Sequence, residues 1–298
     1  MPRRAASRRA IRYSAQSGAS GSKFRLLLHL CAFGLLFGTA PCGALAQVDQ
    51  PIGCATTEGP AGTVVKIESS LVLRLDSGLS VRLSEIGAPG ADWTDRPSTD
   101  VTAAALHRLA LGKTAQIFFD GAKTDRHGRA LGQVVVGGEG GGWLQRALLE
   151  EGAAYVDTWP TNRACAAGLL AAEATARGAA KGMWSDPDNR ILSVAEAAEA
   201  EGRFAIIEGQ VLDVSKAGKP QRWFLNFGAD WRKDFTVTIE PGALRLFKKA
   251  GVDPATLKGA QVRVRGYVGW SFGPEIAAAN PEVIEVLTAG PAAAGNPQ

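Results

Sequence analysis

The sequence predicts a mainly β protein with added helices, organised as a small β-barrel braced by helices and then a second β-barrel. Three observations predict this class. Short segments with period-two alternation of apolar and polar residues fill much of residues 62–136 and return between 203 and 287. Helical segments lie among and after the first strands, whereas one short helix interrupts the second set. A chain of 298 residues, 46% of them hydrophobic, can bury one large core or two small ones.

Residues 1–46 have the features of an export signal. They contain seven Lys or Arg residues and no acid, an apolar run from Leu26 to Ala40, and the segment GALAQ, in which Ala44 and Ala46 fit a small-residue cleavage site. We therefore expect cleavage after Ala46 and a periplasmic or secreted mature protein. Two alternatives remain open: a twin-arginine route, which the segment SRRAIR resembles, and an uncleaved anchor. No later segment is long and apolar enough to suggest a membrane span.

The charge balance depends on whether this signal is removed. The whole chain has a formal charge of +4, but loss of the signal would leave 26 basic and 29 acidic residues. Residues 47–202 contain 14 basic and 20 acidic side chains, whereas residues 203–298 contain 12 and 9. Affinity for a polyanion is therefore expected mainly in the second half.

Two cysteines, Cys54 and Cys165, remain after removal of the signal. In an oxidising compartment we expect them to form a disulfide, which would close a loop of about 110 residues and contribute roughly 4 to 5 kcal/mol in the chain-entropy model. Two separate thiols are the alternative. Nothing in the cysteine spacing indicates a metal site.

The first barrel is expected over residues 60–187. Its first three strands lie within residues 62–86, broken at Ser69-Ser70 and at the hairpin signal Asp76-Ser77-Gly78. The remaining elements are expected as a helix at 101–112, strands at 113–120 and 129–136, a helix at 142–152, and a helix that begins at Cys165 and stops at Gly182.

A second barrel, of the OB type, is expected over residues 203–288. Five strands with a helix between the third and fourth is the order typical of that barrel. The strands are expected at 203–215, 222–228, 234–240, 260–270 and 282–287, and the helix at 242–251. Residues 188–202, polar and alanine-rich, are expected to be a linker or connecting helix, and the tail 289–298 is expected to be disordered.

Four stretches, taken together, resemble the staphylococcal nuclease (thermonuclease) family. They are VVKIESSLVLRL, VRLSEIGAPG, DRHGRALGQVVV with WLQRALLEEGAAYV, and LLAAEATARGAAKGMWSDP, and they occur in the family's order across residues 62–187. The resemblance implies a five-stranded OB barrel with three helices. It also implies the family's activity, which is hydrolysis of phosphodiester bonds in DNA and RNA with calcium, two arginines and a glutamate.

The family's arginines are present in this sequence, but its key acids are not. The resemblance places the two arginines at Arg82 and at Arg129, the latter in DRHGR. The other family positions, namely two calcium-binding aspartates, a calcium-binding carbonyl and the glutamate assigned as the base, fall on Ser70, Gly87, Ala88 and Gly90.

These replacements predict little hydrolysis by the family mechanism. Calcium takes about six to eight oxygen ligands, usually several from carboxylates, and of the expected acids only Glu68 remains, at a position that is not a principal ligand. A positioned base contributes roughly 10² to 10⁴ in rate, and Gly90 has no side chain. Without the Lewis-acid effect of the metal, the transition state loses several kcal/mol more of stabilisation. We therefore expect no cofactor in this site.

Other side chains near the missing base could in principle replace it. Alternation along the strand puts Glu85 on the face opposite Ser84, so we expect Glu85, like Asp92 and Asp95 in the following loop, to be a solvated surface acid. A lone loop histidine is usually just exposed, although His127 could act as a base near neutral pH.

Two roles remain open for Arg82 and Arg129. They could form a bidentate fork for a phosphate or a carboxylate. They could instead pair with acids such as Glu68 or Asp125 and stabilise the barrel without any ligand.

The second half interleaves aromatic and basic residues in the segment RWFLNFGADWRKDFTV. Period two puts half of these aromatics in the barrel core, whereas Trp231 and Trp270 lie near turns and are the better candidates for exposure. With Arg232 and Lys233 they predict a surface on which the bases of single-stranded nucleic acid stack, at roughly 1 to 3 kcal/mol per base.

The favoured hypothesis is an exported, non-hydrolytic protein that binds single-stranded nucleic acid or an envelope protein. The alternative is a working phosphodiesterase with an altered site that uses Arg82 and Arg129. A third possibility is a domain that mediates only protein contacts.

Overall fold

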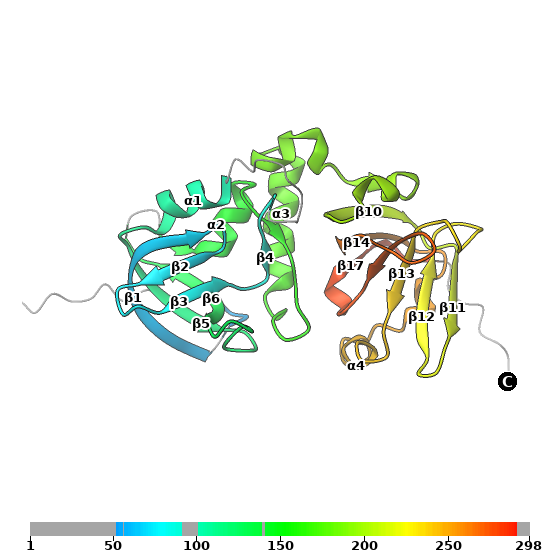
Figure 1. The fold of residues 1–298 in the computed structure, drawn as a ribbon, viewed down its shortest axis with the longest axis horizontal. Coiled ribbons are helices and arrows are strands. Elements are labelled where there is room, and N and C mark those ends of the chain that lie inside the picture. Colours follow the sequence, from blue (N-terminus) through cyan, green and yellow to red (C-terminus); the bar gives the residue numbers. More distant parts are fainter. Residues whose placement is uncertain (1–51, 56, 91–100, 139–140, 291–298) are drawn as a thin grey trace, which may run out of the picture. The chain divides into compact units, whose positions relative to one another are not determined.

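Alternating apolar residues in the first half form a closed five-stranded barrel in the computed structural model, which describes residues 52–55, 57–90, 101–138 and 141–290 (Figure 1). The strands of the ring pair in the order β3-β2-β1-β5-β6, and a parallel pairing of β3 with β6 closes it. They are β1 (Thr57–Ser69), β2 (Val72–Leu75), β3 (Ser80–Leu83), β5 (Thr114–Phe119) and β6 (Ala130–Val136). The predicted mainly β class and the first barrel are confirmed.

The hairpin between β2 and β3 shows how the local sequence produces these strands. Leu73 and Leu75 are fully buried, whereas Arg74 between them is exposed, as period-two alternation requires. Gly78 has a φ of 84°, a left-handed conformation that glycine adopts without steric penalty, and its N–H donates to the carbonyl of Leu75. The predicted turn at residues 76–78 therefore reverses the chain.

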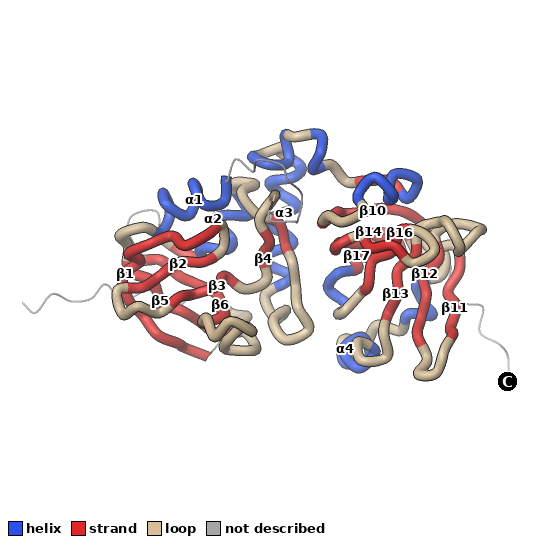
Figure 2. Tube along the Cα trace, in the orientation of Figure 1, coloured by secondary structure: helices blue, strands red, loops and turns tan. Residues whose placement is uncertain are grey.

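Three helices and three short strands complete the first half (Figure 2). The helices are α1 (Val101–Ala110), α2 (Leu144–Glu150) and α3 (Ala166–Gly178), and the strands are β4 (Ile86–Gly87), β7 (Gly142–Trp143) and β8 (Tyr155–Val156). Leu106, Leu148 and Leu169 from the helices are buried in the barrel's core. The prediction that the last helix runs to Gly182 is wrong, because Ala180 adopts a φ of 48°, which ends the helical conformation.

The second half contains two further sheets. A four-stranded sheet has the order β17-β14-β10-β9, and a five-stranded sheet has the order β11-β12-β13-β16-β15. Their strands are β9 (Leu192–Ser193), β10 (Phe204–Gln210), β11 (Asp213–Ala217), β12 (Arg222–Asn226), β13 (Thr236–Ile239), β14 (Gln261–Tyr267), β15 (Gly269–Trp270), β16 (Pro274–Ala277) and β17 (Ile284–Thr288). Helix α4 (Leu244–Lys249) lies between β13 and β14 in the sequence. That these sheets close into an OB-type barrel stays a prediction.

Two strands of the second half, β9 and β16, have no counterpart among the predicted strands. The segment Pro274–Ala277 forms β16, which pairs in parallel with β13 and antiparallel with β15. Its four residues are too few to show alternation, and its first residue is a proline. The predicted strand at 260–270 is in turn divided between β14 and β15.

The described residues bury two separate apolar cores. The first includes Leu83, Ile117 and Val134, and the second includes Val237, Phe247 and Val264. The segment expected as a linker carries β9 and a 3-10 helix at Val194–Ala200, and Leu192, Ala197 and Ala200 are buried in the second core. The domain boundaries inferred from the sequence stay a prediction.

Cys54 and Cys165 form a disulfide that spans 111 residues, with Cα atoms 5.0 Å apart. Cys165 is the residue before α3 and is 1% exposed, so the bridge anchors the beginning of the described chain to the core of the first half. No helix in the described part of the chain has the length and apolar character needed to cross a bilayer. The expected export signal and most of the expected disordered tail lie outside the described residues.

A buried ion pair joins strand β14 to helix α3. Arg265 is 1% exposed, and its guanidinium donates to Glu173 at 2.8 Å and to Glu285 at 2.5 Å. Glu173 is fully buried and also accepts from the backbone N–H of Val156 and from Arg177. Burial lowers the pKa of Arg265, but the carboxylates of Glu173 and Glu285 outweigh this and raise it above its ordinary value. The buried charges of Arg265 and Glu173 therefore each lie beside an opposite charge.

Removal of this guanidinium should be strongly destabilising. We expect Arg265→Ala to lower the free energy of unfolding by about 3 to 5 kcal/mol, because the substitution leaves Glu173 buried with reduced compensation. Urea unfolding measures the loss. The control Lys258→Ala removes an exposed pair with Asp213 and should change stability by less than about 1 kcal/mol. Equal effects of the two substitutions would contradict the assigned role of Arg265.

Candidate functional site

Arg82 and Arg129 line one cavity of about 460 Å³ in the first half. Arg82 is the third residue of β3, and the pairing of β3 with β6 places it opposite Leu131. Arg129 immediately precedes β6, at the end of the loop that begins at Asp125. The barrel therefore brings together the two arginines that the sequence places 47 residues apart.

The guanidinium of Arg82 is directed at the backbone of its own strand end. Its Nη1 donates to the carbonyl of Leu83 and, at 3.4 Å, to the carbonyl of Ile86. Burial is the main cause that lowers the pKa of Arg82, and Arg129 lowers it further, while the carboxylate of Asp157 opposes both. Part of the hydrogen-bonding capacity of Arg82 is thus used to hold the turn that follows β3.

Arg129 is paired with an acid from its own loop. Its Nε donates to Asp125 at 2.7 Å, and the backbone N–H groups of His127 and Arg129 donate to the same carboxylate. Although burial raises the pKa of Asp125, these hydrogen bonds hold it below its ordinary value. Glu68, the other acid proposed as a partner, is paired with Arg74 instead.

The positions that bind calcium in the family do not fit that ion here. Gly87 in β4 pairs with Tyr155 in β8, and a Cβ atom at Gly87 would overlap the ring of Tyr155 and lie 2.8 Å from its hydroxyl oxygen. The space that a metal-binding aspartate side chain needs at this position is therefore filled by an aromatic ring. Gly90, at the base position, has a φ of 73°, which a glutamate would rarely adopt. No step through calcium follows from these residues.

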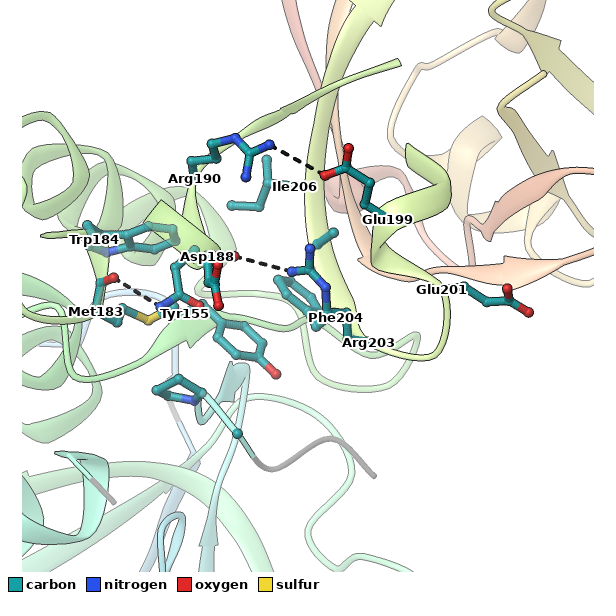
Figure 3. Close-up of a pocket in the computed structure, with 14 residues that line it drawn as sticks. Tyr155, Met183, Trp184, Asp188, Arg190, Glu199, Glu201, Arg203, Phe204 and Ile206 are labelled. Carbon is teal, nitrogen blue, oxygen red and sulfur yellow. Dashed lines mark hydrogen bonds and ion pairs between the residues drawn. The ribbon is translucent and has the colours of Figure 1, made fainter. Parts of the chain in front are cut away.

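The ring that fills this space is itself held by the second half. Tyr155 stacks on Phe204 of β10, with ring centroids 3.9 Å apart and planes inclined by 19°. Both rings, together with Pro89 and Gly90, line a second cavity of about 260 Å³ (Figure 3). Arg203 also lines this cavity, and its Nη1 donates to the backbone carbonyl of Asp188 at 3.3 Å. The turn that would hold the base thus faces aromatic side chains.

The prediction that Glu85 is a solvated surface acid is wrong. Glu85 is 2% exposed, and Ser84 beside it is buried as well. Simple alternation fails because β3 ends at Leu83 and Glu85 adopts a φ of 60°, which turns its side chain back into the protein. A residue with a Cβ atom in this left-handed conformation carries a backbone strain of roughly 1 kcal/mol or more.

Burial and a neighbouring acid favour the neutral form of Glu85, whereas the backbone N–H of Cys165 favours its ionised form. Its Oε1 accepts from the backbone N–H of Cys165 at 3.0 Å and from Gln133 at 3.4 Å. Burial and then a hydrogen bond with Asp120 raise the pKa of Glu85 to about 9. Asp120 in turn accepts from Asn162 at 2.8 Å and from Gln133 at 3.2 Å. The raised pKa of Glu85 therefore belongs to a buried carboxyl group that lies beside a second acid.

Of the other side chains considered as replacements, the structure describes only the histidine. Asp92 and Asp95 lie outside the described residues. His127 is exposed at the rim of the cavity of Arg82 and Arg129, with its Nε2 3.1 Å from Nε of Arg126. Sequence reasoning missed the burial of Glu85, because the alternation of a strand does not extend past Leu83, where β3 ends.

In the second half, the aromatic residues chosen from the sequence are exposed. Trp231 and Trp270 are 50% and 54% exposed, and Arg232 and Lys233 are exposed as well. Arg232 lies over the ring of Trp231, 4.4 Å from its centroid. The Nζ atom of Lys233 lies 3.8 Å from the Oδ2 atom of Asp230. These side chains form a mixed aromatic and cationic surface on the loop between β12 and β13 and on β15.

Phe272 belongs to the same surface and was missed by the sequence prediction. It is 70% exposed, it has a φ of 66°, and its ring makes an edge contact with Trp231 at 5.8 Å between centroids. We use the name aromatic patch for Trp231, Trp270 and Phe272. Three large exposed rings of which two are in contact can stack on planar groups, such as nucleobases.

Comparison with known families supports the relationship inferred from the sequence. Residues 80–186 match the family model described as staphylococcal nuclease homologue. The match includes Arg82, the loop that ends at Arg129 and all three helices of the first half, and it ends before the second half begins. No curated protein shows significant similarity to the chain. The resemblance of the first half is thus confirmed, and it suggests a function related to nucleic acids.

Glu85 should make the stability of the protein depend on pH. Its pKa is raised from 4.5 to about 9, so the folded chain holds a proton that the unfolded chain releases above about pH 4.5, and stability falls as the pH rises toward 9. In Glu85→Gln the amide can replace the protonated carboxyl. We expect the free energy of unfolding of Glu85→Gln, relative to that of the unsubstituted chain, to increase by about 1.4 kcal/mol per pH unit. Between pH 5 and pH 7 this amounts to up to about 3 kcal/mol.

Urea unfolding at pH 5, 6, 7 and 8 tests this expectation. The matched control is Glu150→Gln, an exposed acid of α2 that pairs with Arg146, for which the difference from the unsubstituted chain should not change over this range. A stability difference for Glu85→Gln that stays constant with pH would show that Glu85 is ionised in the folded chain.

Proposed function

Because residues 80–186 form a staphylococcal nuclease-like domain, we propose that this protein is an exported, non-hydrolytic binding protein whose ligand is single-stranded nucleic acid. In this proposal the first half is a scaffold that has lost the family's reaction. The second half supplies the binding surface through the aromatic patch. An envelope protein as the ligand is the alternative outcome of the binding experiment below.

The observation that carries the proposal is the ring of Tyr155 at Gly87. Removal of an acidic ligand could be compensated by a nearby acid, but the space itself is filled here by a side chain that also stacks on Phe204. A metal site would therefore require both a new carboxylate and a rearrangement of β4 and β8. This argument supports loss of the metal-dependent reaction.

The state of the remaining acids supports the same conclusion. Glu85 is neutral at physiological pH because of its raised pKa, and its carboxyl is enclosed by Cys165, Gln133 and Asp120. Asp125 is committed to Arg129 and to backbone N–H groups. A general base must reach the attacking water and must be unprotonated. Neither carboxyl group meets both requirements.

Export is supported by the disulfide as well as by the N-terminal sequence. Disulfides persist in oxidising compartments such as the bacterial periplasm and are rare in the cytosol. The bridge from Cys54 to Cys165 is buried at Cys165, so it belongs to the folded core.

A plasmid-nicking assay tests the loss of hydrolysis. We expect residues 47–298 to convert no more supercoiled plasmid than a protein-free control in calcium, magnesium or manganese, because nothing at Gly87 or Gly90 can hold the ion or activate water. Samples with EDTA give the metal-free baseline.

The cavity shared by Arg82 and Arg129 favours a second candidate, a phosphodiesterase with an altered site. Under that hypothesis nicking is metal-dependent and is abolished in Arg82→Ala and in Arg129→Ala. Nicking with both properties would overturn the proposal, whereas nicking that survives both substitutions would indicate a contaminating nuclease.

Titration with a fluorescent oligodeoxythymidine tests binding by the second half. We expect Trp231→Ala to weaken binding about 5- to 100-fold, because a stacked base contributes roughly 1 to 3 kcal/mol. Arg232→Ala should also reduce the slope of log affinity against log salt by about 0.7, the value for one phosphate contact on a single strand.

Trp159→Ala is the matched control for this titration. Trp159 is 49% exposed, almost the same as Trp231, but it lines the cavity of the first half. Its substitution should leave the affinity unchanged. A loss of affinity in Trp159→Ala that Trp231→Ala does not share would move the binding surface to the first half, and equal losses would contradict the assignment to the aromatic patch. No binding by the unsubstituted chain would leave an envelope protein as the ligand class.

A further inference from the structure

One group of potential metal ligands comes together among the described residues, and it does not include any calcium position of the family. A carboxylate oxygen of Glu85, a carboxylate oxygen of Asp120 and the sulfur of Cys165 all lie within 4.8 Å of one another. The sulfur of Cys165 is bonded to that of Cys54, so the oxidised chain offers two carboxyl groups and no thiolate. Reduction of this bond would leave a thiol at Cys165 within the cluster and a second thiol, that of Cys54, next to Cys165.

An unpartnered buried atom points to a ligand at this cluster. Glu85 is 2% exposed, and its Oε2 is buried with no hydrogen-bond donor within reach, while Oε1 is held by the N–H of Cys165. Buried carboxyl oxygens usually accept hydrogen bonds or coordinate metals. Oε2 is thus free to accept a cation without breaking the contact that positions the side chain.

We propose that reduction of the Cys54–Cys165 disulfide creates a site for one zinc-type divalent cation, with the two thiolates and the carboxylates of Glu85 and Asp120 as ligands. The reductant is a dithiol. It breaks the bond between the two cysteine sulfurs, supplies two electrons and two protons to form two thiols, and is itself oxidised to a disulfide. Binding of the cation then releases the two thiol protons and the carboxyl proton of Glu85.

The ligand set selects the cation. Zinc takes four ligands in a tetrahedron and accepts cysteine sulfur and carboxylate oxygen, whereas calcium takes about six to eight oxygens. Two thiolates bound to one zinc at about 2.3 Å lie roughly 3.8 Å apart. The Cα atoms of Cys54 and Cys165, 5.0 Å apart, are compatible with that separation.

The surroundings support such a site electrostatically. Two thiolates and two carboxylates exceed the charge of a divalent cation, and Arg82 and Arg129 line the cavity that Glu85 also borders. Gln133 donates to Asp120 at 3.2 Å, which orients this ligand in the way that outer-shell partners do in metal sites. The proposal does not depend on the proposed binding of nucleic acid.

Cobalt(II) is the probe, because tetrahedral thiolate coordination gives it intense visible bands and a thiolate charge-transfer band. Residues 47–298 are reduced with dithiothreitol, freed of reductant under argon and titrated. We expect one cobalt ion per reduced chain, none in the oxidised chain, and displacement by one equivalent of zinc. Glu85→Gln and Asp120→Asn should each weaken cobalt binding at least tenfold, while Glu150→Gln, an exposed acid of α2, should not.

Thermal melting of the reduced chain with and without zinc gives a second measurement that does not depend on the folding of the variants. Zinc should raise the melting temperature of the reduced chain and leave that of the oxidised chain unchanged. Absence of the thiolate band in the reduced chain overturns the proposal. So does cobalt binding that both carboxyl substitutions leave intact, or a reduced chain whose melting zinc does not change.

Discussion

The contact between Gly87 and the ring of Tyr155 determines what the first half of this protein can do. Strands β4 and β8 pair at these two residues, and the ring lies where a side chain at position 87 would need to extend. The same ring stacks on Phe204, so the absence of a side chain at position 87 and the contact with the second half share one physical feature. A glycine at this position is therefore a structural requirement as well as the loss of a ligand.

The two arginines that match the family make contacts that stabilise the first half of the chain. Arg129 holds its own loop together through Asp125, and Arg82 donates to carbonyls at the end of β3. Their charges also lie beside a cavity that Glu85 borders. Because both arginines make contacts within the fold, their presence does not by itself indicate hydrolysis.

A buried acid gives the first half a chemical property that its family pattern does not predict. Glu85 combines a left-handed backbone, near-complete burial and a carboxyl oxygen without a donor, three features that each disfavour folding. Its contacts with Cys165 and Asp120 offset part of this penalty and connect the acid to the disulfide. Strained backbone conformations and strongly shifted pKa values are concentrated at the functional sites of proteins.

The sequence by itself determined the strands of the first barrel, the absence of acids at Gly87 and Gly90 and the pairing of the two remaining cysteines, because alternation, residue type and cysteine number are local or countable properties. Only the tertiary structure decided that Glu85 is buried, that Tyr155 fills the empty position and that Phe272 contacts Trp231. Each of these depends on a turn conformation or on a contact between distant segments. Pattern reasoning does not contain that information, since periodicity describes a regular element only up to the residue where the element ends.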